Sequence, residues 1–167
     1  MGPDGTTRGI VTALCHAGAM VTWAEFTAAA PEFAARAGAL LQSRKHKTMA
    51  TLRADGSPRI SGTETQISDG QLTIGSMPGA VKARDLLRDP RVAIHGPTVD
   101  APEGRESAWA GEAKVAGVAV VIESPDDSHR FAIDVREVVL TRLNEAGDAL
   151  VIESWHDGRG YARRERA

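Results

Sequence analysis

The sequence has little cysteine, and this scarcity limits the kinds of protein it can encode. Cys15 is the only cysteine among 167 residues, so no disulfide can form within the chain. No group of cysteines and histidines has the spacing of a structural zinc site either. These absences exclude a small disulfide-stabilised secreted domain and predict a protein of the reducing cytoplasm.

The sequence also lacks an excess of charge and a long apolar run. Twenty Lys and Arg residues stand against 22 Asp and Glu residues, which gives a formal net charge of -2. A chain so balanced has no strong overall field to attract nucleic acid or an anionic membrane. The longest apolar stretches, such as residues 116–122, fall far short of the roughly 20 residues that cross a bilayer. We therefore expect a soluble protein that binds neither nucleic acid nor membrane.

The first 20 residues do not predict a folded element. They contain Pro3 and several glycines, and the apolar run over residues 10–14 is too short for a signal peptide. We expect residues 1–20 to be a disordered N-terminal extension, with Met20 as an alternative start. The remaining residues, 21–167, fit one domain.

The pattern after residue 21 predicts a mainly β protein. Thr22 and Glu25 form a capping box that starts a helix, and Pro31 predicts a kink or a division into two short helices ending near Ser43. Asp-Gly turn dipeptides at residues 55–56 and 69–70 then separate short Thr-, Ile- and Val-rich runs. The expected strands are 46–53, 59–67, 71–76, 91–95, 106–122, 134–143 and 149–155, with a helix over 79–89. Six or seven strands with two or three helices predict an antiparallel barrel with peripheral helices.

The expected strand 59–67 is unusually polar on both faces. Residues 59, 61, 63 and 65 (Arg, Ser, Thr, Thr) share one face, and residues 60, 62, 64 and 66 (Ile, Gly, Glu, Gln) share the other. Two interpretations remain open. The strand either lines a polar cleft, or it is an edge strand with water on both sides.

The junction between the strand 71–76 and the helix 79–89 has the ingredients of a phosphate pocket. A helix N-terminus offers free backbone amides, Ser76 a hydroxyl and Lys82 a cation one turn into the helix. The alternative is a solvated helix face on which Lys82 pairs with Asp85 and Asp89.

Together these segments resemble a known family. Residues 48–61, 69–76 and 82–94 are similar to the pyridoxamine 5'-phosphate oxidase-like split barrel, and to the actinobacterial deazaflavin-dependent reductases built on the same fold. The likeness continues in residues 109–115, 131–139 and 153–155. It implies a six- to seven-stranded antiparallel split β-barrel over residues 21–167.

The resemblance also implies a cofactor site. In the family an arginine on the second strand and a lysine early in the following helix hold the flavin phosphate, and a hydroxyl at the end of the third strand faces the cofactor. A tryptophan near the flavin also has a counterpart in this chain. The cofactor-binding residues implied here are Arg59, Ser61, Thr63, Ser76, Lys82, Arg84 and Trp155.

The expected activity follows from the cofactor, which is FMN or, alternatively, the deazaflavin coenzyme F-420. Such cofactors carry hydride chemistry themselves, so no catalytic side chain is identified, and the small-molecule substrate stays unnamed. Glu64 replaces a second lysine of the oxidases and Ala80 a serine, which argues against pyridoxamine phosphate oxidation itself. A non-catalytic barrel that holds flavin or haem is a further alternative.

The resemblance finally implies a homodimer with two equivalent sites at the subunit interface. The basic segment over residues 159–166 is the candidate for reaching the partner's cofactor.

Overall fold

The computed structural model describes residues 19–124 and 127–167. The expected extension over residues 1–20 therefore lies outside the described residues, apart from its last two.

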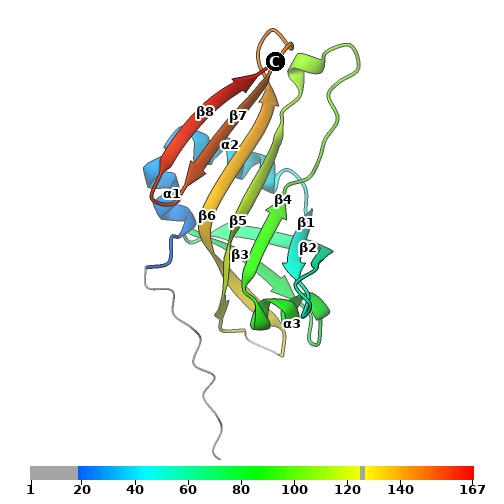
Figure 1. The fold of residues 1–167 in the computed structure, drawn as a ribbon, viewed down its shortest axis with the longest axis vertical. Helices are drawn as coiled ribbons and strands as arrows, with labels where there is room; N and C mark the ends of the chain where they lie inside the picture. Colours follow the sequence, from blue (N-terminus) through cyan, green and yellow to red (C-terminus); the bar gives the residue numbers. More distant parts are fainter. Residues whose placement is uncertain (1–18, 125–126) are drawn as a thin grey trace, which may run out of the picture.

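The described strands form one antiparallel sheet in the order β3-β2-β1-β4-β5-β6-β7-β8 (Figure 1). Because β3 also pairs with β6, the first six strands close into a barrel, and β7 and β8 extend the sheet beyond it. This confirms a mainly β fold built on an antiparallel barrel with peripheral helices. The strands are β1 (His46–Leu52), β2 (Pro58–Ser68), β3 (Gln71–Ser76), β4 (Arg91–His95), β5 (Glu112–Ile122), β6 (His129–Leu143), β7 (Leu150–His156) and β8 (Gly160–Arg166).

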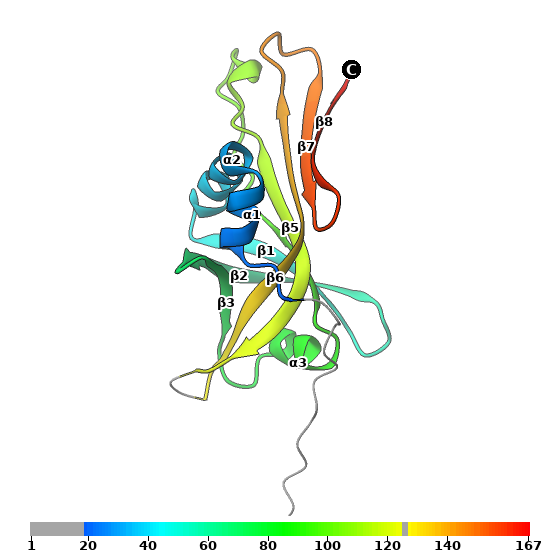
Figure 2. The same cartoon turned by 90° about the vertical axis from the view of Figure 1, so that its left-hand side faces the viewer.

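The long strand β6 belongs to both the barrel and the extension. Its residues 129–132 pair with β3, its residues 137–143 pair with β7, and β5 accompanies it along almost its whole length. The β5–β6 register shifts between Ala116 and Gly117, at a β-bulge. A bulge increases local twist, which fits the point where β6 leaves the barrel (Figure 2).

Two helices, α1 (Trp23–Ala29) and α2 (Pro31–Gln42), cover one face of the sheet (Figure 2). The predicted capping box is confirmed: the Glu25 amide donates to the Thr22 hydroxyl at 3.2 Å, and the Thr22 amide donates to the Glu25 carboxylate at 2.7 Å. Pro31 occupies the first turn of α2, where its missing N–H costs nothing, and the chain divides into two helices there.

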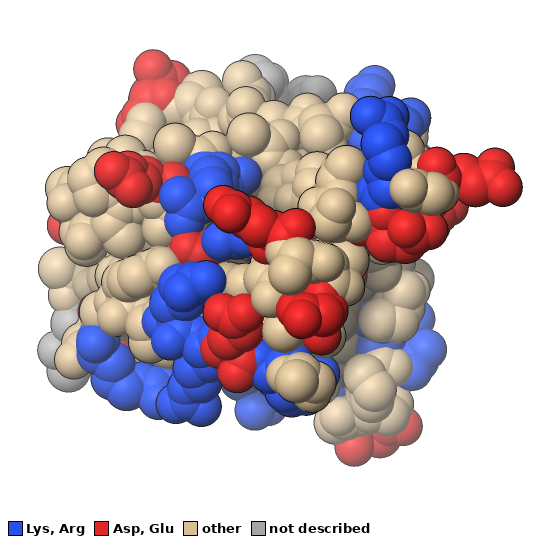
Figure 3. All heavy atoms as spheres, turned by 90° about the horizontal axis from the view of Figure 1, so that it is seen from above, with Lys and Arg blue, Asp and Glu red and all other residues tan. Residues whose placement is uncertain are grey.

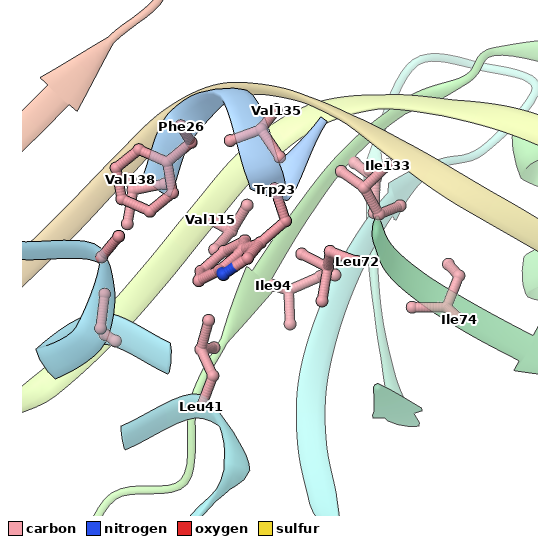
Figure 4. Packing of buried hydrophobic residues seen from close by; sticks show 14 of the residues in the cluster. Trp23, Phe26, Leu41, Leu72, Ile74, Ile94, Val115, Ile133, Val135 and Val138 are labelled. Carbon is pink, nitrogen blue, oxygen red and sulfur yellow. The ribbon is translucent and has the colours of Figure 1, made fainter. Parts of the chain in front are cut away.

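The main hydrophobic core lies between these helices and the strands (Figure 4). The ring centroid of Phe26 lies 5.0 Å from that of Trp23 and 5.1 Å from that of Trp155. All three side chains are buried, so α1 is fixed against β7 by aromatic packing.

The third helix, α3 (Val81–Arg88), lies at the opposite end of the molecule from the C-terminus, beside β1 and β2 (Figure 1). Its residue range agrees with the predicted helix over 79–89. None of the helices in the described part of the chain is long and apolar enough to span a membrane.

Two predicted strands were wrong in extent, and one strand was not predicted. The strand expected from residue 106 begins at Glu112, because Gly111 has φ 92° and residues Glu106–Ala108 form a 3-10 turn. The strand expected from residue 134 begins at His129. The strand β8 was not expected, since six of its seven residues are exposed and show no alternation.

The end of the molecule that carries the C-terminus shows both signs of charge (Figure 3). Basic side chains gather toward one edge of this view, with acidic side chains beside them. This end therefore presents no uniform field of one sign.

Candidate functional site

An open groove of about 1010 Å³ lies where β2 and β3 separate. Residues 65–68 of β2 pair with residues 71–74 of β3, whereas residues 62–64 of β2 pair with β1, and the end of β3 pairs with β6. The groove lies beside this divergence. Its lining residues are His46, Gly62, Thr63, Glu64, Thr65, Gln66, Thr73, Ile74, Gly75, Ser76, Met77, Pro78, Ala80, Lys82, Ser128 and Arg130.

Two glycines leave part of the groove floor without side chains. A Cβ atom added at Gly62 or at Gly75 would meet no heavy atom within 4 Å, and neither glycine has a positive φ. Bare backbone lets a flat ligand approach closely. The sequence interpretation of residues 59–67 as the wall of a polar cleft is therefore the one that the geometry favours.

Lys82 lies at this floor. Its Nζ donates a 2.6 Å hydrogen bond to the carbonyl oxygen of Gly62. The alternative of pairing with Asp85 and Asp89 does not hold, because Asp85 binds Arg59 and Arg88, and Asp89 binds Arg91. Lys82 makes no ion pair with any residue in the described ranges, so its charge remains available to an anion.

The start of α3 offers further groups for an anion. Ala80 provides no side-chain cap, and no acidic residue lies in the first turn, so the first amides keep their positive partial charge. The buried hydroxyl oxygens of Ser76 and Thr65 have no hydrogen-bond partner among the described residues. Buried polar atoms without a hydrogen-bond partner are rare in proteins, and both of these atoms belong to residues that line the groove.

Arg130 is a groove residue that the sequence analysis missed. It lies on β6 opposite Gly75 of β3, and it makes no ion pair with any described residue. It was missed because the strand was expected to begin at residue 134. The alternating apolar residues Phe131, Ile133 and Val135 were the signal that could have extended the strand to this point.

An acidic side chain lies on the same groove. The Glu64 carboxylate is 3.3 Å from the Lys45 ammonium and 3.9 Å from the His46 ring, and all three side chains are largely exposed. Exposed pairs of this kind contribute little to stability. Among residues 19–124 and 127–167, no group of three or more His, Cys, Asp and Glu side chains could hold a metal ion.

The structure brings three of the seven predicted cofactor residues to the groove: Thr63, Ser76 and Lys82. Ser61 lies on β2 just before the lining residues. Arg84 is exposed on α3 and does not line the groove. Trp155 is buried against Phe26 in the core.

Arg59, the remaining predicted residue, is occupied by a buried carboxylate. Its Nε donates to Asp85 Oδ2 at 2.5 Å, and the hydroxyl of Thr51 donates to the same oxygen at 2.9 Å. Arg88 donates to Asp85 Oδ1 at 3.0 Å. Burial alone would raise the pKa of Asp85, but the hydrogen bonds from Arg59, Arg88 and Thr51 outweigh it and lower the pKa to about 2.

A closed six-stranded antiparallel barrel, with peripheral helices and a groove where two of its strands diverge, defines a split-barrel protein. The family model described as pyridoxamine 5'-phosphate oxidase matches residues 33–152, which is more than half of the chain. The chain belongs to this family. A search of the curated proteins found no match.

Solved structures share the fold. A pyridoxamine 5'-phosphate oxidase-related, FMN binding protein from Nostoc punctiforme aligns with a TM-score of 0.56 and 12% identity, over 85% of this chain and 96% of that one. PhzG from Burkholderia lata, in complex with tetrahydrophenazine-1-carboxylic acid, aligns with a TM-score of 0.59 and 11% identity, over 83% and 90%. A heme binding protein from Mycobacterium smegmatis aligns with a TM-score of 0.51 and 16% identity, over 79% and 86%. At these identities the likeness shows the fold alone.

Proposed function

We propose that the groove binds a flavin-type cofactor, with FMN as the leading candidate, and that the protein transfers hydride to or from a small molecule. One observation carries the proposal: Lys82, a cation without a carboxylate partner among the described residues, lies beside the uncapped start of α3. An ammonium next to helix N-terminal amides is suited to a phosphate.

The groove also fits the flat part of such a cofactor. Gly62 and Gly75 leave open space above the strand backbone, and the hydroxyl of Ser76 is free to donate or accept a hydrogen bond. Because the carbonyl of Gly62 accepts from Lys82, it points away from β1. The backbone amide of Glu64, two residues on, points the same way and can donate to the polar edge of a ring, while its carbonyl oxygen accepts from the Thr63 hydroxyl at 3.3 Å.

A bound flavin or deazaflavin supplies the hydride chemistry itself. The residues of the chain hold the phosphate through Lys82 and the α3 amides, keep the ring against the β2 and β3 backbone, and orient its polar edge. This arrangement assigns no proton transfer to a side chain of the groove.

We further propose that two copies of the chain form a homodimer that closes the groove. Three apolar side chains on β2, before α3 and in α3 are exposed: Ile60 (69%), Met77 (80%) and Val81 (45%). On the neighbouring strands, Ala50, Ala93 and Ala116 lie side by side in register and give a flat surface. A second subunit would cover these apolar groups and add the missing wall of the groove.

Two alternatives use the same groove. Coenzyme F-420 has a flat ring and a phosphate, and the groove volume and the additional cation of Arg130 suit a longer anionic ligand. Haem is the other alternative, because His46 lines the groove and a neighbour of the same fold is a heme binding protein. In this alternative the barrel holds haem without turnover.

The absorbance spectrum of the purified protein, followed by titration with FMN, tests the proposal. We expect either the two visible bands of oxidised flavin or a colourless protein that binds added FMN. A Soret band would identify the bound cofactor as haem and not flavin. A colourless protein that binds F-420 and not FMN would select the deazaflavin, and one that binds none of the three would refute the proposal.

A further inference from the structure

We propose that Arg59 is a positioning residue. It acts through Asp85 to hold α3 against β1 and β2, and so sets where Lys82 and the α3 N-terminus lie at the groove. The inference rests on the proposed function, because it concerns how the proposed phosphate site is kept in place.

We use the word clamp for the hydrogen bonds that Asp85 accepts from Arg59, Thr51 and Arg88. Residue Asp85 is 2% exposed, and its two carboxylate oxygens accept hydrogen bonds from three side chains. Arg59 and Thr51 face each other across the β1–β2 ladder and reach the same oxygen from the sheet. Charge-assisted hydrogen bonds in a buried site are among the stronger polar contacts in proteins.

Arg88 extends the clamp to the end of the helix. Its Nη2 donates both to Asp85 and to the carbonyl oxygen of Leu52 at 2.6 Å, so the last turn of α3 is tied to β1. Asp85 is therefore the point where the helix, β1 and β2 meet.

The helix depends on such tertiary contacts. α3 has eight residues, which is too short to be stable alone, and its buried apolar side chains are only Ala83 and Leu86. Asp85 follows Lys82 by three positions, so both lie on the same side of the helix. Release of Asp85 would therefore let the first turn and Lys82 move relative to Gly62.

The family resemblance implies a different role, in which Arg59 contacts the cofactor phosphate directly. In this structure its Nε is committed to Asp85, and Arg59 does not line the groove. The two roles give opposite expectations for Asp85. If Arg59 binds the phosphate, Asp85 competes for it, and removing the Asp85 charge frees the arginine. If Arg59 is a positioning residue, removing the Asp85 charge releases the helix.

The experiment compares Arg59→Gln, Asp85→Asn and the double variant by two measurements. The first is the FMN dissociation constant. The second is hydrogen exchange of the α3 amides in the cofactor-free protein. We expect each single change to weaken FMN binding about tenfold, the double change to add little, and both single changes to speed exchange in α3. Unchanged or tighter FMN binding in Asp85→Asn, together with weaker binding in Arg59→Gln, would overturn the proposal.

Two further variants keep the test decisive if Asp85→Asn does not fold. Arg88→Gln removes a donor to Asp85 from the far end of the helix, and it should also weaken FMN binding and speed exchange. Arg91→Gln is the matched control, since Arg91 pairs with Asp89 and not with Asp85, and it should change neither measurement. Wild-type binding in Arg88→Gln would count against the clamp.

The exchange measurement separates this inference from the proposed function. If the wild-type protein binds no FMN, the proposed function fails, but exchange in α3 still reports on the clamp. Unaltered exchange in Arg59→Gln would then refute the positioning role on its own.

Discussion

The ammonium of Lys82 donates a 2.6 Å hydrogen bond to the carbonyl oxygen of Gly62 and thereby joins the first turn of α3 to the free side of β2. The same contact holds a cation without a carboxylate partner among the described residues beside Gly62, which has no side chain. The other cations of α3 lie differently: Arg88 binds the buried Asp85, and Arg84 is exposed away from the groove. The three cations of α3 therefore differ in their surroundings: Lys82 lies at the groove, Arg88 at the buried Asp85, and Arg84 in solvent.

Replacing Lys82 by methionine should weaken FMN binding roughly ten- to hundredfold, because a charge-assisted contact contributes about 1.5–3 kcal/mol. Calorimetric titration measures this change. Arg84→Met is the matched control, with the same charge lost from the same helix but outside the groove, and it should bind nearly as the wild type does. Equal losses in both variants would show a general electrostatic effect in place of a Lys82 contact.

Filling the floor of the groove should block the ligand without harming the fold. Gly62→Leu and Gly75→Leu place a side chain in open space at positions whose φ suits any residue, so we expect stability to change by less than about 1 kcal/mol. FMN binding should fall at least about tenfold, since the ring loses its contact surface. Wild-type affinity in both variants would place the flavin ring elsewhere.

A side chain at Gly117, in contrast, should destabilise the fold. A Cβ atom at this position would lie 2.1 Å from the carbonyl oxygen of Asp134, at the bulge between β5 and β6. Gly117→Ala should therefore destabilise the fold by about 1–3 kcal/mol or more, because the strand backbone has to shift. Urea denaturation gives this value, with Gly62→Ala as the control that should leave the midpoint unchanged.

Local sequence signals predicted much of the fold. The capping box at Thr22 and Glu25, the break at Pro31 and the Asp69-Gly70 turn each act through neighbouring residues, and each appears in the structure. In contrast, β8 has no alternating pattern, because it is an edge strand that pairs with β7 and packs on the helices mainly through Tyr161, against Phe33.

The site was less predictable because its contacts join distant residues. Lys82 was recognised from its place in a helix, but its partner Gly62 is 20 residues away. The resemblance implies that Arg59 binds the phosphate, but its partner Asp85 lies 26 residues away on α3, where Thr51, opposite Arg59 in the β1–β2 ladder, also binds it. Composition and spacing carry no information on which of two anions an arginine reaches.

The carboxylate of Asp85 should make stability fall in acid. Hydrogen bonds lower its pKa from 3.8 to about 2, so the folded state favours the charged form. The contribution to stability is complete above about pH 4 and is lost as the pH falls toward 2. Urea denaturation across this range should show a shallower decline for Asp85→Asn than for the wild type. Parallel declines would assign the acid sensitivity to other carboxylates.

The proposed homodimer predicts a link between assembly and cofactor binding. Light scattering should give twice the chain mass of 17.7 kDa, and FMN should bind once per chain. Ala93 lies exposed between Ala50 and Ala116 on the flat surface, so Ala93→Arg should hinder a partner without disturbing the core. We expect this variant to be monomeric and to lose FMN affinity at least about tenfold, because the second wall of the groove would be missing. Ala146→Arg, in the exposed turn between β6 and β7, is the control and should remain a dimer with wild-type affinity. A monomeric Ala93→Arg protein that binds FMN as tightly as the wild type would show that each groove is complete within one chain.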